Sequence, residues 1–147
     1  MRIWHYQLLP YLPNSQFKGQ LRELLAIMHE WRDKGKTNHL LINKVMKYPK
    51  AELAFYFALY YRRYYERYGV NIKFPIYQAF VDFGCEDIDK CNDVPLFKDW
   101  HNQTYLDICM WNLYEKHLAV GKSRVTDEEW ARLCEGYRQI CGKDFAV

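Results

Sequence analysis

The chain has 147 residues, which fits one domain that buries about two-thirds of the surface exposed by its unfolded form. Half of the residues are apolar and 18% are aromatic, a composition that argues against disorder and requires large rings to fill a core or line a cleft. The 21 Lys and Arg residues exceed the 18 Asp and Glu residues by only three charges. This balance allows a local phosphate-binding patch but lacks the strong basic excess of many nucleic-acid binders.

The cysteines and the first residues indicate the compartment. Five cysteines cannot all pair within one chain, and their spacings do not match a zinc site, so free thiols in a reducing compartment are expected. The first 13 residues contain Arg2, His5 and two prolines in place of the apolar run of a signal peptide. No stretch approaches the roughly 20 apolar residues of a membrane span. We therefore expect a soluble, cytoplasmic protein.

An extended lead-in is predicted before the first helix. Pro10 and Pro13 disfavour a helical backbone in the residues that precede them, so residues 1–14 are expected to be extended. The first helix is predicted over about residues 16–32, and Gly35 follows at a common helix stop.

One face of this helix contains a charged pair. Apolar side chains recur at helical spacing and should face the core, namely Leu21, Leu24, Leu25 and Met28. Arg22 and Glu23 therefore turn to the other side of a rigid element. From spacing alone, they fit a solvated charged face near a helix start, where a carboxylate suits the helix dipole.

The second long helix is the most aromatic part of the chain. A helical turn is predicted over residues 39–45, and Pro49 then opens a helix that continues to about Tyr68, before Gly69. Its tyrosines form two neighbouring stripes with arginines on the outer side. Two interpretations remain open, because the rings can pack in the core or stack on unpaired bases beside phosphate contacts.

The rest of the chain is also predicted to be helical or irregular. Residues 70–75 are expected to be extended, and residues 76–99 to form short helical pieces and loop. A third long helix is predicted over about residues 101–119. Residues 126–129 have the form of a capping box that opens a shorter fourth helix, which ends before Gly142. We therefore predict an all-α fold with three long helices, a shorter C-terminal helix and an extended N-terminal segment.

Several familiar catalytic motifs do not occur in the sequence. The five histidines have no paired metal-binding spacing, and the zinc deaminase signature, the glycine-rich nucleotide loop and the serine nucleophile elbow are missing. Gly35-Lys36-Thr37 has the ending of a phosphate loop, but Glu30 occupies the position of that motif's first glycine. Lys34 and Lys36 remain candidates for phosphate contact as loop cations.

Short segments in collinear order give the strongest functional signal. They are Met1-Arg2-Ile3, Leu21-Arg22-Glu23-Leu24, Gly35-Lys36 and Tyr68-Gly69-Val70-Asn71-Ile72-Lys73. In order and separation they resemble the phage endonuclease V family of pyrimidine-dimer DNA glycosylases over about the first 75 residues. A weaker match extends to about residue 118 through Asp99-Trp100-His101 and Leu113-Tyr114-Glu115-Lys116. We interpret residues 1–147 as a single helical domain in which residues 120–147 form a C-terminal extension.

The resemblance implies a catalytic amine. In that family the N-terminal α-amine attacks C1′ of the damaged nucleotide, releases the base through an imine and cuts the strand by β-elimination. Met1 would supply this amine, and Glu23 matches the glutamate that stabilises the cationic sugar and moves protons. An α-amine suits the step because its pKa of about 7.7–8.0 leaves a neutral fraction at physiological pH.

The resemblance also implies a DNA-binding surface. Arg2 and Arg22 match arginines that hold phosphates near the lesion, and Lys116 matches a basic residue of the third helix. With Lys34 and Lys36, they form the predicted DNA-binding set. The expected partner is double-stranded DNA with a damaged base or an abasic site, bound by a monomer that needs no metal or cofactor.

The sequence departs from the family at several positions. Arg2 follows Met1 where the best-known form exposes a threonine, and a bulky second residue normally keeps the methionine in place. Family positions that are basic, or hold a histidine near the active site, fall here at Ala26, Asn112 and Gln16 or Phe17. These losses affect the expected specificity for pyrimidine dimers more than the expected roles of the Met1 amine and the Glu23 carboxylate. The alternative is a non-catalytic helical module that binds nucleic acid or protein.

Overall fold

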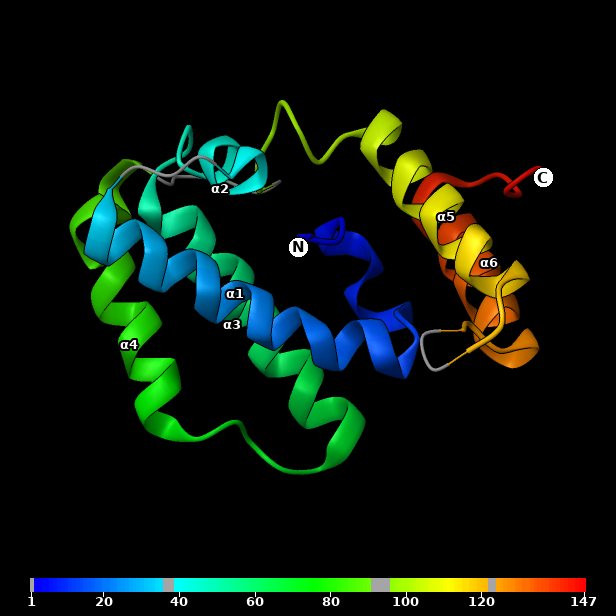
Figure 1. Cartoon of the computed structure of the whole chain (residues 1–147), viewed down its shortest axis with the longest axis horizontal. Coiled ribbons are helices and arrows are strands. Elements are labelled where there is room, and N and C mark those ends of the chain that lie inside the picture. Colours follow the sequence, from blue (N-terminus) through cyan, green and yellow to red (C-terminus); the bar gives the residue numbers. More distant parts are fainter. Residues whose placement is uncertain (1, 36–38, 91–95, 122–123) are drawn as a thin grey trace. The chain divides into compact units, whose positions relative to one another are not determined.

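The computed structural model describes residues 2–35, 39–90, 96–121 and 124–147 (Figure 1). Every regular element in these residues is helical, which confirms the predicted all-α class. The elements are η1 (Tyr6–Tyr11), α1 (Asn14–Lys34), α2 (Leu40–Val45), α3 (Lys50–Tyr68), α4 (Phe74–Gly84), η2 (Cys85–Lys90), α5 (Gln103–Leu118) and α6 (Asp127–Cys141). No helix of the described residues is long and apolar enough to cross a membrane.

The chain divides into two compact units, which are described separately. The first unit contains Arg2 and Arg22–Lys98, and the second contains Ile3–Leu21 and Asp99–Val147. The helix α1 therefore supplies residues to both units. The organisation of residues 1–147 as a single domain stays a prediction.

Aromatic rings form the core of the first unit, where α3 packs on α4. Leu53, Phe57 and Tyr60 of α3 are buried, and the Phe57 ring stacks on Phe80 of α4 with 4.0 Å between centroids. Tyr65 is 52% exposed. Core packing is therefore confirmed for the buried stripe of α3, whereas base stacking by the more exposed tyrosines stays a prediction.

The helix α4 is more regular than the sequence analysis predicts. It begins at Phe74, within the segment expected to be extended, and Pro75 lies in its first turn. Proline is pre-organised for this position, because its missing N–H has no partner in a first turn. Phe80 and Phe83 are buried at helical spacing. The predicted short helical pieces are therefore present as α4 and η2, whereas the extended prediction was wrong for residues 74 and 75. Burial against α3 stabilises this helix although its sequence signal is weak.

The N-terminal segment also differs from its prediction. Residues Tyr6–Tyr11 form the 3-10 helix η1 rather than an extended chain. The Leu8 N–H donates to the His5 carbonyl at 2.9 Å, and the Gln7 N–H donates to His5 Nδ1 at 3.2 Å. A short 3-10 turn tolerates Pro10 because the fixed φ of proline lies within its range. Burial of Leu8 and Leu9 stabilises the turn.

The second unit contains α5, α6 and η1. The buried face of α5 consists of Leu106, Cys109, Met110 and Leu113, which recur at helical spacing. The predicted capping box is present at the start of α6, where Thr126 and Glu129 exchange two hydrogen bonds of 3.1 Å. The second oxygen of the Glu129 carboxylate accepts the Asn14 N–H at 2.8 Å. This glutamate therefore joins the start of α6 to the start of α1.

Candidate active site at Glu23

The apolar face of α1 determines how Glu23 is presented. Leu24, Ile27 and Met28 are fully buried, so Arg22 points away from the core, whereas Glu23 lies at the edge of the buried face, four residues before Ile27. Arg22 is exposed, and Glu23 is partly buried. The helix thus holds a carboxylate and a guanidinium next to each other on a rigid element.

A long-range hydrogen bond brings the start of the chain to Glu23. The Arg2 backbone N–H donates to Glu23 Oε2 at 2.8 Å, across 21 positions of sequence. The structure therefore unites two of the predicted site residues within the first unit. Met1, the predicted source of the amine, lies outside the described residues.

The surroundings of Glu23 alter its proton affinity. Partial burial raises the pKa of the Glu23 carboxyl, while the Arg2 N–H and the charges of Arg2 and Arg22 oppose this rise. A carboxyl with a raised pKa gives up and recovers a proton closer to neutral pH than an exposed glutamate does. The arrangement therefore suits proton transfer beside developing positive charge.

The other predicted DNA-binding residues have different settings. Lys34 lies about 16 Å beyond Glu23 along α1, is well exposed, and pairs with Glu30 at 3.1 Å. Lys36 lies outside the described residues. Lys116 belongs to α5 in the second unit, where its carbonyl accepts the Val125 N–H at 3.3 Å. The structure therefore groups Arg2 and Arg22 with Glu23, and it describes Lys116 separately.

Three side chains that the sequence analysis missed contact the N-terminal backbone. Gln20 Oε1 accepts the Trp4 N–H at 2.9 Å, and the Tyr105 hydroxyl donates to the Ile3 carbonyl at 2.6 Å. His101 Nδ1 accepts the Tyr6 N–H at 3.1 Å. The available signal was a glutamine three positions before Glu23, and thus on the same helical face. His101 occurs only in the weaker part of the family resemblance, and Tyr105 gave no signal, because their contacts cross about 100 positions of sequence.

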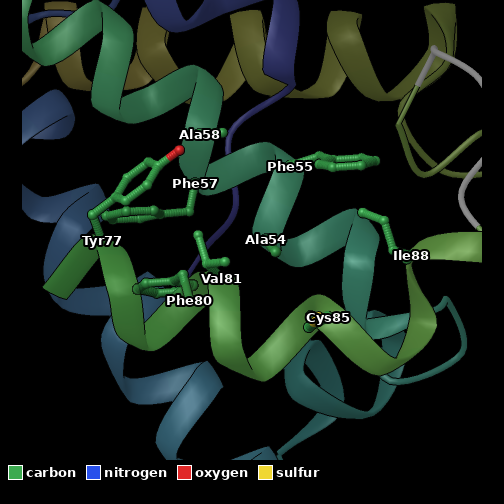
Figure 2. A pocket seen from close by; sticks show the side chains of 10 residues that line it. Ala54, Phe55, Phe57, Ala58, Tyr77, Phe80, Val81, Cys85 and Ile88 are labelled. Carbon is green, nitrogen blue, oxygen red and sulfur yellow. The ribbon is translucent and has the colours of Figure 1, made fainter. Parts of the chain in front are cut away.

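A separate hollow of about 170 Å³ opens beside the α3–α4 core (Figure 2). Its lining is mostly apolar and comprises Ala54, Phe55, Phe57, Ala58, Tyr77, Phe80, Val81, Gly84, Cys85 and Ile88. The lining includes one thiol and one phenol but no carboxylate, amine or guanidinium, so it offers no groups for the chemistry that Glu23 supports. Elsewhere in the described residues, no three His, Cys, Asp or Glu side chains gather as a metal site requires.

The observations define an all-α protein with a partly buried glutamate on its first helix, bonded to the backbone of the second residue. The family model of pyrimidine dimer DNA glycosylases matches residues 1–76, slightly more than half of the chain, and includes Arg2, Arg22 and Glu23. The chain therefore belongs to the pyrimidine dimer DNA glycosylase family, which confirms the resemblance and makes it a DNA-repair glycosylase with DNA as its substrate. No curated protein and no solved structure matches the chain. The helices α5 and α6 lie beyond the matched residues.

Proposed function

We propose that the protein excises a damaged base, such as a pyrimidine dimer, from double-stranded DNA and then cleaves the strand at the resulting abasic site. The α-amine of Met1 acts as the nucleophile, and Glu23 transfers protons. The hydrogen bond between the Arg2 N–H and Glu23 supports this proposal most directly. Met1 is joined to Arg2 by one peptide bond, and adjacent Cα atoms are about 3.8 Å apart, so the amine belongs to the residue next to this contact.

The proposed reaction proceeds in four steps. The neutral amine bonds to C1′ while the glycosidic bond breaks, and the departing base takes up a proton. The sugar ring then opens to an imine as its ring oxygen gains a proton from Glu23. Removal of a C2′ proton expels the 3′ phosphate by β-elimination, and water finally hydrolyses the imine. Glu23 suits the second and third steps because its raised pKa allows it to act as acid and then as base.

Cationic residues next to Glu23 would hold the DNA during this reaction. Arg2 and Arg22 can contact phosphates on either side of the lesion, and their charges also oppose loss of the anionic form of Glu23. Lys34, Lys36 and Lys116 complete the proposed set of DNA contacts. An enzyme acting at C1′ in duplex DNA must also disturb base stacking at the lesion.

The decisive experiment is borohydride trapping on a duplex with a single abasic site. We expect a covalent adduct with the native N-terminus and none after acetylation of the α-amine, with retention of Met1 checked by mass spectrometry. A duplex with one cyclobutane pyrimidine dimer then tests base excision. No adduct from a folded protein with a free amine would contradict the imine mechanism and favour the alternative of a non-catalytic binding module.

A further inference from the structure

Side chains from distant positions hold the backbone at the start of the chain. Within residues 2–6, three N–H groups and one carbonyl have a side-chain partner at least 16 positions away in sequence. Chain termini ordinarily lack such restraints and fray. The described part of the N-terminal segment is therefore fixed by specific polar contacts as well as by packing.

The first restraint comes from α1. Gln20 is fully buried, and its Oε1 accepts the Trp4 N–H at 2.9 Å. Gln20 and Glu23 lie three residues apart, on one face of the helix. Their side-chain oxygens accept the N–H groups of Trp4 and Arg2, which are alternate residues. Two neighbouring acceptors on α1 thus determine where the backbone of residues 2–4 lies along the helix.

The second restraint comes from α5. The Tyr105 hydroxyl donates to the Ile3 carbonyl at 2.6 Å, a group between the two N–H groups held by α1. The Tyr105 ring is itself fixed by stacking on His101, with 5.0 Å between centroids. His101 also accepts the Tyr6 N–H at 3.1 Å. Tyr105 is therefore a rigid donor rather than a mobile surface hydroxyl.

We propose that Gln20 and Tyr105 are positioning residues for the amine reaction. This inference rests on the proposed function, in which the nucleophile is attached two residues before Ile3. By fixing the backbone of Trp4 and Ile3, the two side chains limit the rotations available to the residues that precede them. Attack on C1′ requires the amine within about 3–3.5 Å and in line, so lost restraint lowers the fraction of productive encounters.

The test compares borohydride trapping rates on an abasic-site duplex, under single-turnover conditions with saturating enzyme. The variants are Gln20→Leu and Tyr105→Phe, and the matched control is Gln139→Leu, at an exposed glutamine of α6 that donates to Glu135 at 2.9 Å. We expect trapping rates lower by roughly 10-fold to 100-fold for the two variants, since small misplacements have effects of this order. The control should match the wild type.

Two further readouts separate positioning from a general loss of structure. The Kd for the abasic duplex and the pH midpoint of trapping should stay at the wild-type values, because neither variant removes a proposed phosphate contact or one of the acid–base groups of the proposed reaction. Thermal melting identifies a variant that does not fold. Tyr105→Phe keeps the ring and its stacking, so it remains informative if Gln20→Leu does not fold.

The outcomes are distinguishable. No adduct from the wild type overturns the proposed function and this inference with it. An adduct from the wild type, with equal trapping rates in both folded variants, overturns the inference alone. A rate that falls only in proportion to DNA affinity also contradicts positioning, because it indicates a role in binding or folding.

Discussion

Glu23 and Glu52 make the same kind of contact in the first unit. Each carboxylate accepts a backbone N–H from a distant residue, Arg2 at 2.8 Å and Phe97 at 2.7 Å. Burial raises the pKa of both carboxyls, and the accepted N–H opposes the rise in both. Their surroundings differ. The charges of Arg2 and Arg22 act on Glu23, whereas Glu52 lies beside the buried Phe97.

The difference shows that a raised pKa alone does not identify a catalytic carboxylate. Phe97 has a φ of 52°, a left-handed conformation that is strained for a bulky residue. The bond from its N–H to Glu52 holds this backbone in place, which is a structural role. Glu23 instead accepts the backbone N–H of Arg2 and is influenced by the charges of Arg2 and Arg22, which is the setting that the proposed reaction requires.

The largest expected effect separates the two glutamates by activity. Glu23→Gln should lower the trapping rate on an abasic duplex by at least about 100-fold, because a proton-transfer group is lost. Glu52→Gln keeps an oxygen acceptor and should change the rate by less than about twofold. Both variants should bind the duplex as tightly as the wild type in a fluorescence titration. Equal losses of trapping rate in the two variants would assign the same role to both carboxylates.

The pH dependence of folding stability distinguishes these two carboxyls from the buried His5. Burial lowers the pKa of His5 from 6.5 to about 4, although a hydrogen bond with the backbone of His101 opposes this. Below pH 6.5 the unfolded chain binds the proton first, so the folded state loses stability as the pH falls towards 4. This shift corresponds to roughly 3 kcal/mol. Urea unfolding between pH 7 and pH 4 measures it, and His5→Phe should remove this contribution.

The contribution of the two glutamates to folding stability changes with pH in the opposite direction to that of His5. A carboxyl with a raised folded pKa favours folding at low pH, and its contribution is lost as the pH rises through that pKa. A wild type that loses no more stability than His5→Phe on acidification would contradict the assignment of a buried neutral imidazole.

A smaller effect tests the structural role of Glu52. Glu52→Ala leaves the partly buried Phe97 N–H without this acceptor, which should lower the free energy of unfolding by about 1–3 kcal/mol. The trapping rate per folded molecule should not change. Chemical denaturation and single-turnover trapping give the two quantities, and Glu52→Gln serves as the control that keeps the acceptor. If Glu52→Ala lost trapping activity but no stability, Glu52 would have a role in the reaction rather than a structural role.

The smallest effect is expected in the second unit, outside the family match. Thr126→Ala removes the side chain that caps α6 and should lower the free energy of unfolding by about 1 kcal/mol. Thr126→Ser retains a hydroxyl and should lose less. Neither variant should change trapping at 25 °C. A trapping defect in Thr126→Ala alone would instead indicate that α6 contributes to the reaction.

Local signals in the sequence predicted several elements of the fold correctly. The predicted stops at Gly35, Gly69 and Gly142 are all glycines with positive φ, a conformation that other residues rarely adopt. The capping box at Thr126 is likewise a relation between residues three apart. By contrast, η1 was missed and α4 was predicted only as short helical pieces, because burial against other elements stabilises them more than their own sequence does.

For the site, the sequence alone determined which groups are available. The spacing of apolar residues predicted that Arg22 and Glu23 turn away from the core, which is correct for the exposed Arg22 but not for the partly buried Glu23. The resemblance to a glycosylase family drew attention to the start of the chain. Only the tertiary structure decided that the Arg2 N–H meets Glu23, and that Gln20 and Tyr105 hold the residues which follow. Hydrogen bonds across 16 to 102 positions have no periodic signature, since they depend on how the helices pack rather than on the spacing within any one of them.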